Sequence, residues 1–161
     1  MLRFFAIATA MVLALAAPAA AQSPGEVFQR ICMAGIVDED MAGERAARTA
    51  LGIGLVSDEY SDADYEDRQL FTGRGYDITR TSNPIGGSCT LEPPAGVTRT
   101  MLERSIAPAL NHWTEGPQLE GRRLWIRILP EGAGRSSKRL ILSIGESETG
   151  RPFVVVASEA G

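Results

Sequence analysis

Histidine and cysteine, which most metal sites and nucleophilic active sites require, are scarce in this sequence. The 161 residues include 1 histidine and 2 cysteines. This set cannot supply the ligands of a zinc site. The chain also lacks a Gly-x-Ser-x-Gly motif, which carries the nucleophile of many serine hydrolases. The sequence therefore predicts no metal site and no cofactor, and it favours a protein that is not an enzyme.

Long apolar runs are absent except at the amino terminus. Residues 4–17 are largely apolar, follow Arg3, and lead into a stretch of small residues that ends at Ala21. This pattern is typical of a secretory signal peptide, and it is shorter than the roughly 20 residues of a membrane-spanning helix. We expect cleavage of residues 1–21. The remaining residues 22–161 would form a single soluble domain in the bacterial periplasm or outside the cell, with no membrane span.

A concentrated basic region is missing as well. The formal net charge is −4, and residues 22–70 hold 11 acidic and 4 basic residues. Nucleic-acid binding needs a concentrated basic face, so nucleic acid is not an expected partner. The most acidic stretch, residues 57–67, predicts a solvated loop, since blocks of like charge repel one another and stay hydrated.

Calcium binding is the alternative interpretation of this acidic stretch. Asp62, Asp64 and Glu66 match the first ligand positions of an EF-hand loop. However, Asp67 stands where that loop needs glycine, and Gly73 stands where it needs a bidentate glutamate. The pattern therefore predicts at most a weak cation site.

The two cysteines, Cys32 and Cys89, predict a disulfide. An even, minimal cysteine count in an exported protein favours a structural bond. Cys32 lies on the apolar side of a predicted helix, and Cys89 lies in a predicted short strand. A bond between them would close a loop of 58 residues. By restricting the unfolded chain, it would add about 4 kcal/mol to the free energy of unfolding.

An exported hydrolase that uses carboxylates, or Cys89 with His112, is the alternative to a binding protein. The segment from Gly86 to Cys89 resembles the papain-type cysteine motif, and this resemblance implies a thiol nucleophile at Cys89. The sequence departs from that motif at Thr90, where an aromatic residue is expected. A disulfide would also remove the thiol that must ionise.

Three helices are predicted from capping residues and apolar spacing. The first begins at Ser23, which can form a capping box with Glu26, and it ends near Gly35. The second follows the acidic residues 38–40. The third begins near Thr98, and Pro108 should kink or split it.

Strands are predicted between and after these helices. Residues 69–81 predict either a hairpin or one bulged strand, and residues 88–92 a short strand. Three β-rich runs follow at residues 122–129, 138–144 and 152–158. The expected fold is a small α+β domain with the order α-α-β-β-α-β-β-β. Its sheet of four to five strands is mostly antiparallel and is covered by helices on one face.

The first of these three runs carries the predicted interaction surface. Leu124, Ile126 and Ile128 share one face of the strand, while Arg123, Trp125 and Arg127 share the other. We expect the arginine-rich side to face solvent, where an exposed Trp125 would anchor an interface. The sequence thus favours a non-enzymatic exported protein that binds an unknown protein or small ligand in the cell envelope.

Overall fold

An eight-stranded antiparallel sheet dominates the computed structural model, which describes residues 22–62, 66–130 and 137–160. The predicted signal peptide, residues 1–21, lies outside the described residues. The strands are β1 (Gly54–Ser61), β2 (Glu66–Gly73), β3 (Tyr76–Asn83), β4 (Gly86–Glu92), β5 (Thr114–Glu115), β6 (Arg123–Leu129), β7 (Lys138–Glu146) and β8 (Pro152–Ala160).

The predicted fold class is therefore wrong, because the molecule is mostly β and its sheet is larger than four to five strands. The acidic stretch predicted as a loop contributes most of β1 and the start of β2. Its charges are tolerated because β1 lies at the edge of the sheet, where its side chains reach solvent. Strand β5, with two residues, is too short to leave a sequence pattern.

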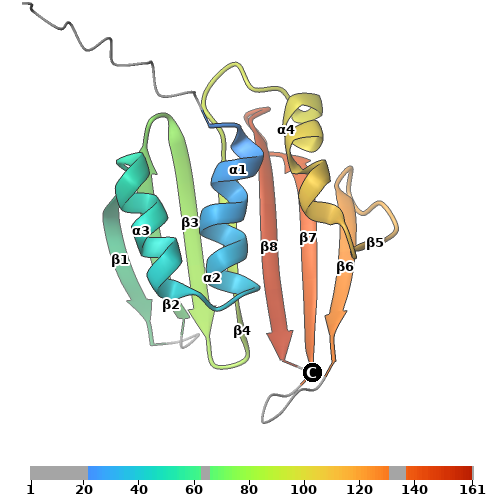
Figure 1. The fold of residues 1–161 in the computed structure, drawn as a ribbon, viewed down its shortest axis with the longest axis horizontal. Helices are drawn as coiled ribbons and strands as arrows, with labels where there is room; N and C mark the ends of the chain where they lie inside the picture. The colour runs from blue at the N-terminus through green and yellow to red at the C-terminus, as the bar shows by residue number, and fades with distance from the viewer. Residues whose placement is uncertain (1–21, 63–65, 131–136, 161) are drawn as a thin grey trace, which may run out of the picture.

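Two meanders of four strands meet in the middle of the sheet (Figure 1). The spatial order is β1-β2-β3-β4-β8-β7-β6-β5, so β4 and β8 pair at the centre. We call β1–β4 the first half and β5–β8 the second half. Residues 69–81 lie in the hairpin of β2 and β3. Of the two predictions for this stretch, the hairpin is confirmed and the single bulged strand is wrong. Arg74 and Gly75 close this hairpin, and both have positive φ, 52° and 81°.

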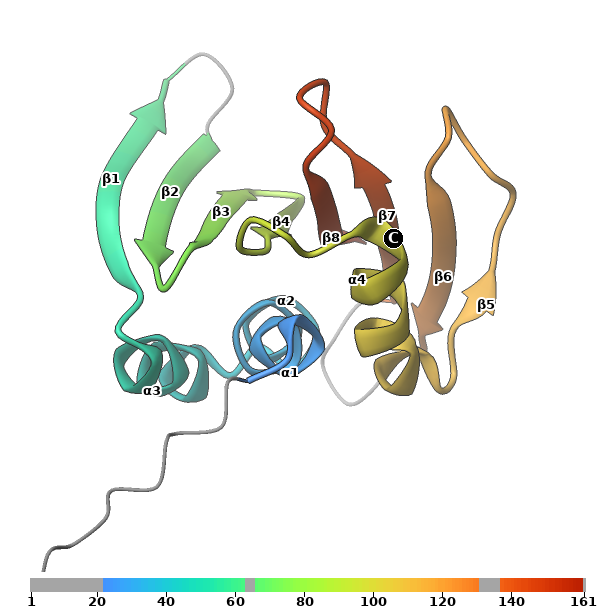
Figure 2. The same ribbon diagram turned by 90° about the horizontal axis from the view of Figure 1, so that it is seen from above.

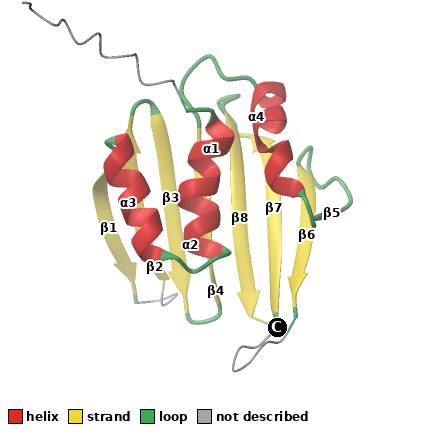
Figure 3. Ribbon diagram, in the orientation of Figure 1, coloured by secondary structure: helices red, strands yellow, loops and turns green. Residues whose placement is uncertain are grey.

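The described helices all lie on one side of the sheet, and none lies on the opposite face (Figures 2 and 3). In the views of Figures 1 and 2, the first helix lies against the centre of the sheet, with α3 towards β1 and α4 towards β6. The helical segments are α1 (Pro24–Phe28), η1 (Gln29–Met33), α2 (Ala34–Ile36), α3 (Met41–Leu51), α4 (Arg99–Ile106) and η2 (Ala107–Leu110).

The first helix comprises α1, the π-helical turn η1 and α2, so it runs past the predicted end at Gly35. Its start has the predicted capping box: the Ser23 N–H donates to the Glu26 carboxylate, and the Glu26 N–H donates to Ser23 Oγ. Cys32 lies in η1 and is bonded to Cys89 in β4, with Cα atoms 5.3 Å apart. The predicted disulfide therefore fixes this helix to the centre of the sheet.

The other two helices also begin and end at local signals. Asp40 accepts a hydrogen bond from the Gly43 N–H at the start of α3, and Gly52 ends that helix with φ 65°. Thr98 caps α4 by accepting from the Met101 N–H. The α-helix stops at Ile106, just before Pro108, and one 3₁₀ turn follows.

One core joins both halves of the sheet to the helices. It includes Phe28 and Ile31 of the first helix, Leu102 and Ile106 of α4, and buried side chains from the inner strands. At Gly25, α1 and α4 approach so closely that an added Cβ would overlap the Ser105 carbonyl. None of the described helices is long and apolar enough to cross a membrane.

Candidate functional site

A cleft of about 440 Å³ lies between α3 and the first half of the sheet. We call it the arginine cleft, because three arginines, one from β3 and two from α3, lie in its wall. The lining residues are Met41, Glu44, Arg45, Arg48, Leu55, Asp67, Gln69, Phe71, Arg80 and Ser82. The cleft exists because α3 contributes long polar side chains, rather than apolar ones, on its side towards β2 and β3.

Glu44 and Arg48 form a fixed pair in this wall. Arg48 Nε donates to Glu44 Oε1 at 2.6 Å, and Arg48 Nη2 donates to Glu44 Oε2 at 3.4 Å. The Arg48 guanidinium also lies 4.0 Å from the centre of the Phe71 ring. Glu44 is 2% exposed, so a charged partner is needed to keep its carboxylate buried. Arg48 is therefore paired with a buried carboxylate and packed against an aromatic ring.

Arg80 has a different environment. It lies on β3 between Gln69 of β2 and Cys89 of β4, half-buried on the helix side of the sheet. Its one described side-chain contact is with Met41, where Nη2 lies 3.1 Å from the thioether sulfur. A guanidinium carries five N–H donors, and a thioether is a weak acceptor. Most of the Arg80 N–H donors therefore have no partner among the described side chains.

Arg45 and Asp67 complete the charges of the cleft. Both are exposed, and neither side chain has an ion-pair partner within the described parts of the chain. Since Glu44 neutralises Arg48, the two remaining arginines face one carboxylate, and the lining carries a net positive charge. Gln69 and Ser82 add polar groups, while Phe71, Leu55 and Met41 add apolar surface.

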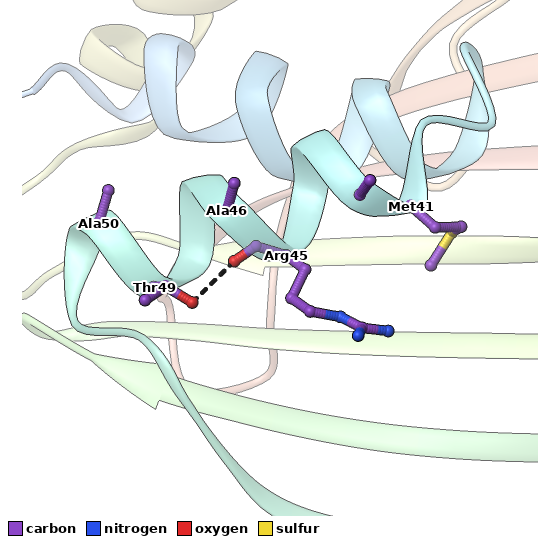
Figure 4. A pocket seen from close by; sticks show the side chains of 6 residues that line it. Met41, Arg45, Ala46, Thr49 and Ala50 are labelled. Carbon is purple, nitrogen blue, oxygen red and sulfur yellow. Dashed lines mark hydrogen bonds between the residues drawn. The ribbon is translucent and has the colours of Figure 1, made fainter.

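A second hollow, of about 720 Å³, runs along the outer side of α3 and shares Met41 and Arg45 with the arginine cleft. Figure 4 shows both side chains extending towards the strands, whereas Ala46 and Ala50 point away from them. The Thr49 hydroxyl donates to the Arg45 carbonyl and is thereby occupied. This hollow offers mainly small apolar side chains, so the chemistry of the region lies in the arginine cleft.

The predicted interaction surface turns out to lie on the opposite side of β6 from the one expected. Trp125 is 6% exposed, so it cannot act as an exposed anchor. Arg123 and Arg127 share its face and lie opposite the buried Ile144 and Leu140 of β7. The aliphatic face with Leu124, Ile126 and Ile128 is the one that no described helix covers.

Arg123 is held by acidic partners from two elements. Its Nη2 donates to Glu115 Oε1 at 2.8 Å, and its Nη1 donates to Glu103 Oε2 of α4 at 3.3 Å. The hydrogen bond to Glu115 is the main reason that the pKa of Arg123 is raised above its ordinary value. The guanidinium also lies 5.0 Å from the Trp125 ring. Arg127 is half-buried and lines another hollow with His112.

The residues of the hydrolase alternative are not brought together. Cys89 is 2% exposed and bonded to Cys32, so its sulfur is not a free thiol. His112 is exposed and lies just before β5, with β8, β7 and β6 between it and β4. Glu44 is the one carboxylate residue among those described that is buried, and its carboxylate is paired with Arg48.

The acidic residues of the calcium pattern lie around the turn between β1 and β2. Asp62 and Glu66 flank this turn, while Asp64 lies outside the described residues. Within the described ranges, no group of three or more His, Cys, Asp or Glu side chains is arranged to hold a metal ion. The weak cation site has no support in that part of the chain.

Comparisons of the chain with protein-family models, with curated proteins and with solved structures find no match. A function for this chain must therefore be inferred from the residues of the site.

The arginine cleft was not predicted, although part of its pattern is visible in the sequence. Glu44 and Arg48 are four positions apart on a predicted helix, a spacing that favours an ion pair. Arg80 follows Ile78 by two positions, so both side chains lie on the same face of β3. An arginine on the same strand face as a buried isoleucine indicates a partly buried charge. The approach of α3 to that arginine, however, depends on the tertiary structure.

Proposed function

We propose that this protein is an exported, non-enzymatic binding protein that holds a small organic anion in the arginine cleft. The observation that carries the proposal is Arg80, a half-buried guanidinium whose described side-chain contact is a single thioether. Guanidinium groups bind carboxylates and phosphates through two parallel charge-assisted hydrogen bonds. A ligand with such a group would supply the acceptors that Arg80 lacks.

The rest of the lining fits an anion with an apolar part. Arg45 adds a second positive charge at the mouth of the cleft, and Gln69 and Ser82 add hydrogen-bonding groups. The Phe71 ring, already held beneath Arg48, and Leu55 offer apolar contact. Ligand sites commonly combine apolar walls with a few polar groups that fix orientation.

Export is the second part of the proposal. The apolar amino-terminal segment predicts secretion, and the Cys32–Cys89 bond favours an oxidising compartment. The intact mass of the protein from the periplasm or medium tests it. We expect a chain that begins at Gln22 and takes up an alkylating reagent only after reduction. A chain that keeps its amino-terminal segment, or that carries two free thiols, would contradict export.

Isothermal titration with phenylacetate and with its neutral amide, phenylacetamide, tests the binding site. Phenylacetate should bind with saturation and the amide should not, because only the carboxylate accepts two charge-assisted hydrogen bonds. Arg80→Gln should weaken phenylacetate binding at least tenfold.

Arg139→Gln is the matched control, because Arg139 is exposed on β7 and loses the same charge. It should leave phenylacetate affinity unchanged. Equal affinity for acid and amide, or equal losses in the two arginine variants, would sink the proposed anion site.

A further inference from the structure

The outer edge of β1 is an open sheet edge of a kind that folded proteins usually protect. Strand β1 has eight residues and stands last in the sheet, and no other described strand pairs with its outer side. At the opposite end, β5 has only two residues. Short edge strands limit pairing with other chains, whereas a long open strand presents a row of backbone donors and acceptors.

This edge strand also exposes large apolar side chains. Leu55, Val56 and Tyr60 are 53%, 60% and 58% exposed. They account for three of the seven large apolar side chains that are exposed in the described chain. Their exposure is not needed for the pairing of β1 with β2, which joins the backbones of the two strands. Exposed apolar groups on an open edge are typical of a surface that receives another strand.

The carboxylates on β1 favour a basic partner segment over a second copy of β1. Asp58 and Glu59 are exposed, and neither carboxylate has an ion-pair partner in the portion of the chain that is described. Pairing β1 with β1 of a second copy would place two such carboxylates from each chain in one short ladder. Like charges on paired strands destabilise each other. A partner segment with basic residues would instead gain from the same two carboxylates.

We infer that the outer edge of β1 binds an extended, basic and apolar segment of a partner protein as an additional strand. Backbone hydrogen bonds to β1 supply affinity, and side chains facing Leu55, Val56 and Tyr60 supply apolar contact. Asp58 pairs with Gln69 and faces the helix side, whereas Glu59 faces the other side, so the partner places one lysine or arginine on each face. The irregular register at Val56 interrupts the ladder, so the partner pairs with residues 57–61 and extends past this point to cover Leu55 and Val56.

The test uses the fluorescently labelled peptide Val-Thr-Val-Lys-Lys-Val-Thr-Val, titrated into the exported protein and followed by anisotropy. Its two adjacent lysines reach opposite faces of the added strand, as Asp58 and Glu59 do on β1. We expect saturable binding and slower hydrogen exchange of the backbone amides in β1. A matched peptide with glutamate in place of both lysines should bind at least tenfold more weakly. The double variant Asp58→Lys/Glu59→Lys should reverse this preference.

Two controls separate strand addition from simple charge attraction. The variant Glu146→Lys/Glu148→Lys makes the same charge change at exposed positions around the turn between β7 and β8, and it should keep the original preference. A lysine peptide with N-methylated backbone amides keeps its charge but cannot complete the ladder, and it should bind at least tenfold more weakly. Equal binding of the methylated peptide, or no saturable binding of the lysine peptide up to about 1 mM, overturns the inference.

Arg80→Gln provides a further readout, because it acts on the arginine cleft and not on the edge. It should leave the affinity for the lysine peptide unchanged. The β1 inference therefore stands or falls independently of the proposed anion site.

Discussion

Arg80 on β3 and Arg123 on β6 both extend to the helix side of the sheet, one in each half of the molecule. In the second half, α4 supplies Glu103 and the chain before β6 supplies Glu115, so Arg123 has two carboxylate partners. In the first half, α3 supplies only the Met41 thioether to Arg80. The carboxylate that α3 does supply, Glu44, is occupied by Arg48.

We propose that this difference separates an arginine that stabilises the fold from one that binds a ligand. Arg123 stabilises the packing of α4 against the sheet, because its hydrogen bonds join one element to the other. Arg80 closes no such link, and α3 leaves a cleft above it. An arginine that is kept half-buried without a carboxylate partner adds little to folding stability, and this is why we assign it to binding.

The largest effect on stability is expected where α1 packs against α4. Gly25→Ala places a methyl group against the Ser105 carbonyl, so α1 and α4 must move apart. We expect a loss of about 1–3 kcal/mol in the free energy of unfolding, measured in urea. Gly54→Ala is the control, since an added Cβ there meets nothing within 4 Å. Equal stability of the two variants would show that the close approach is not required.

Substitution of the two arginines compares the halves directly. Arg123→Gln should lower the free energy of unfolding by about 0.5–1 kcal/mol, because Glu103 and Glu115 lose their shared partner at a partly exposed site. Arg80→Gln should change it by less than about 0.5 kcal/mol. Chemical denaturation of both variants at one pH and ionic strength is the measurement. A larger loss for Arg80→Gln would reverse the roles we assign.

The smallest effect concerns alkaline pH and is confined to the first half. Burial, and secondly the Glu26 carboxylate, raise the pKa of Tyr76 above its ordinary value of 10.0. The unfolded chain then loses the phenolic proton at a lower pH than the folded chain, so the free energy of unfolding falls as pH rises above about 10.

Tyr76→Phe should therefore flatten the alkaline part of the curve of stability against pH, measured by urea denaturation between about pH 8 and pH 11. Tyr60→Phe is the control, because Tyr60 is 58% exposed on β1. If both variants keep the slope of the original protein, Tyr76 is not the group responsible.

Some features of the candidate sites follow from residues close in the sequence, and others depend on residues far apart. The Glu44–Arg48 pair is visible in the sequence as a helical spacing, and the Cys32–Cys89 bond follows from the cysteine count and predicted export. The predicted interaction surface required an exposed Trp125, but this residue is buried, because the face of β6 that it shares with Arg123 and Arg127 is the one towards α4. Alternation alone does not say which face of a strand is covered by a helix.

By itself, the sequence determined the starts of the helices and the three carboxyl-terminal strands, and it left the hairpin of β2 and β3 as one of two alternatives. Each of these depends on residues within a few positions of one another, such as Ser23 with Glu26 or Asp40 with Gly43. Only the tertiary structure decided that the two meanders join through β4 and β8, and that the acidic residues after Gly54 form an edge strand. It also decided that Arg123 has carboxylate partners while Arg80 has none among the described residues. The reason is physical: strand pairing and helix docking join residues far apart in the chain, and their energies depend on neighbours that no local pattern names.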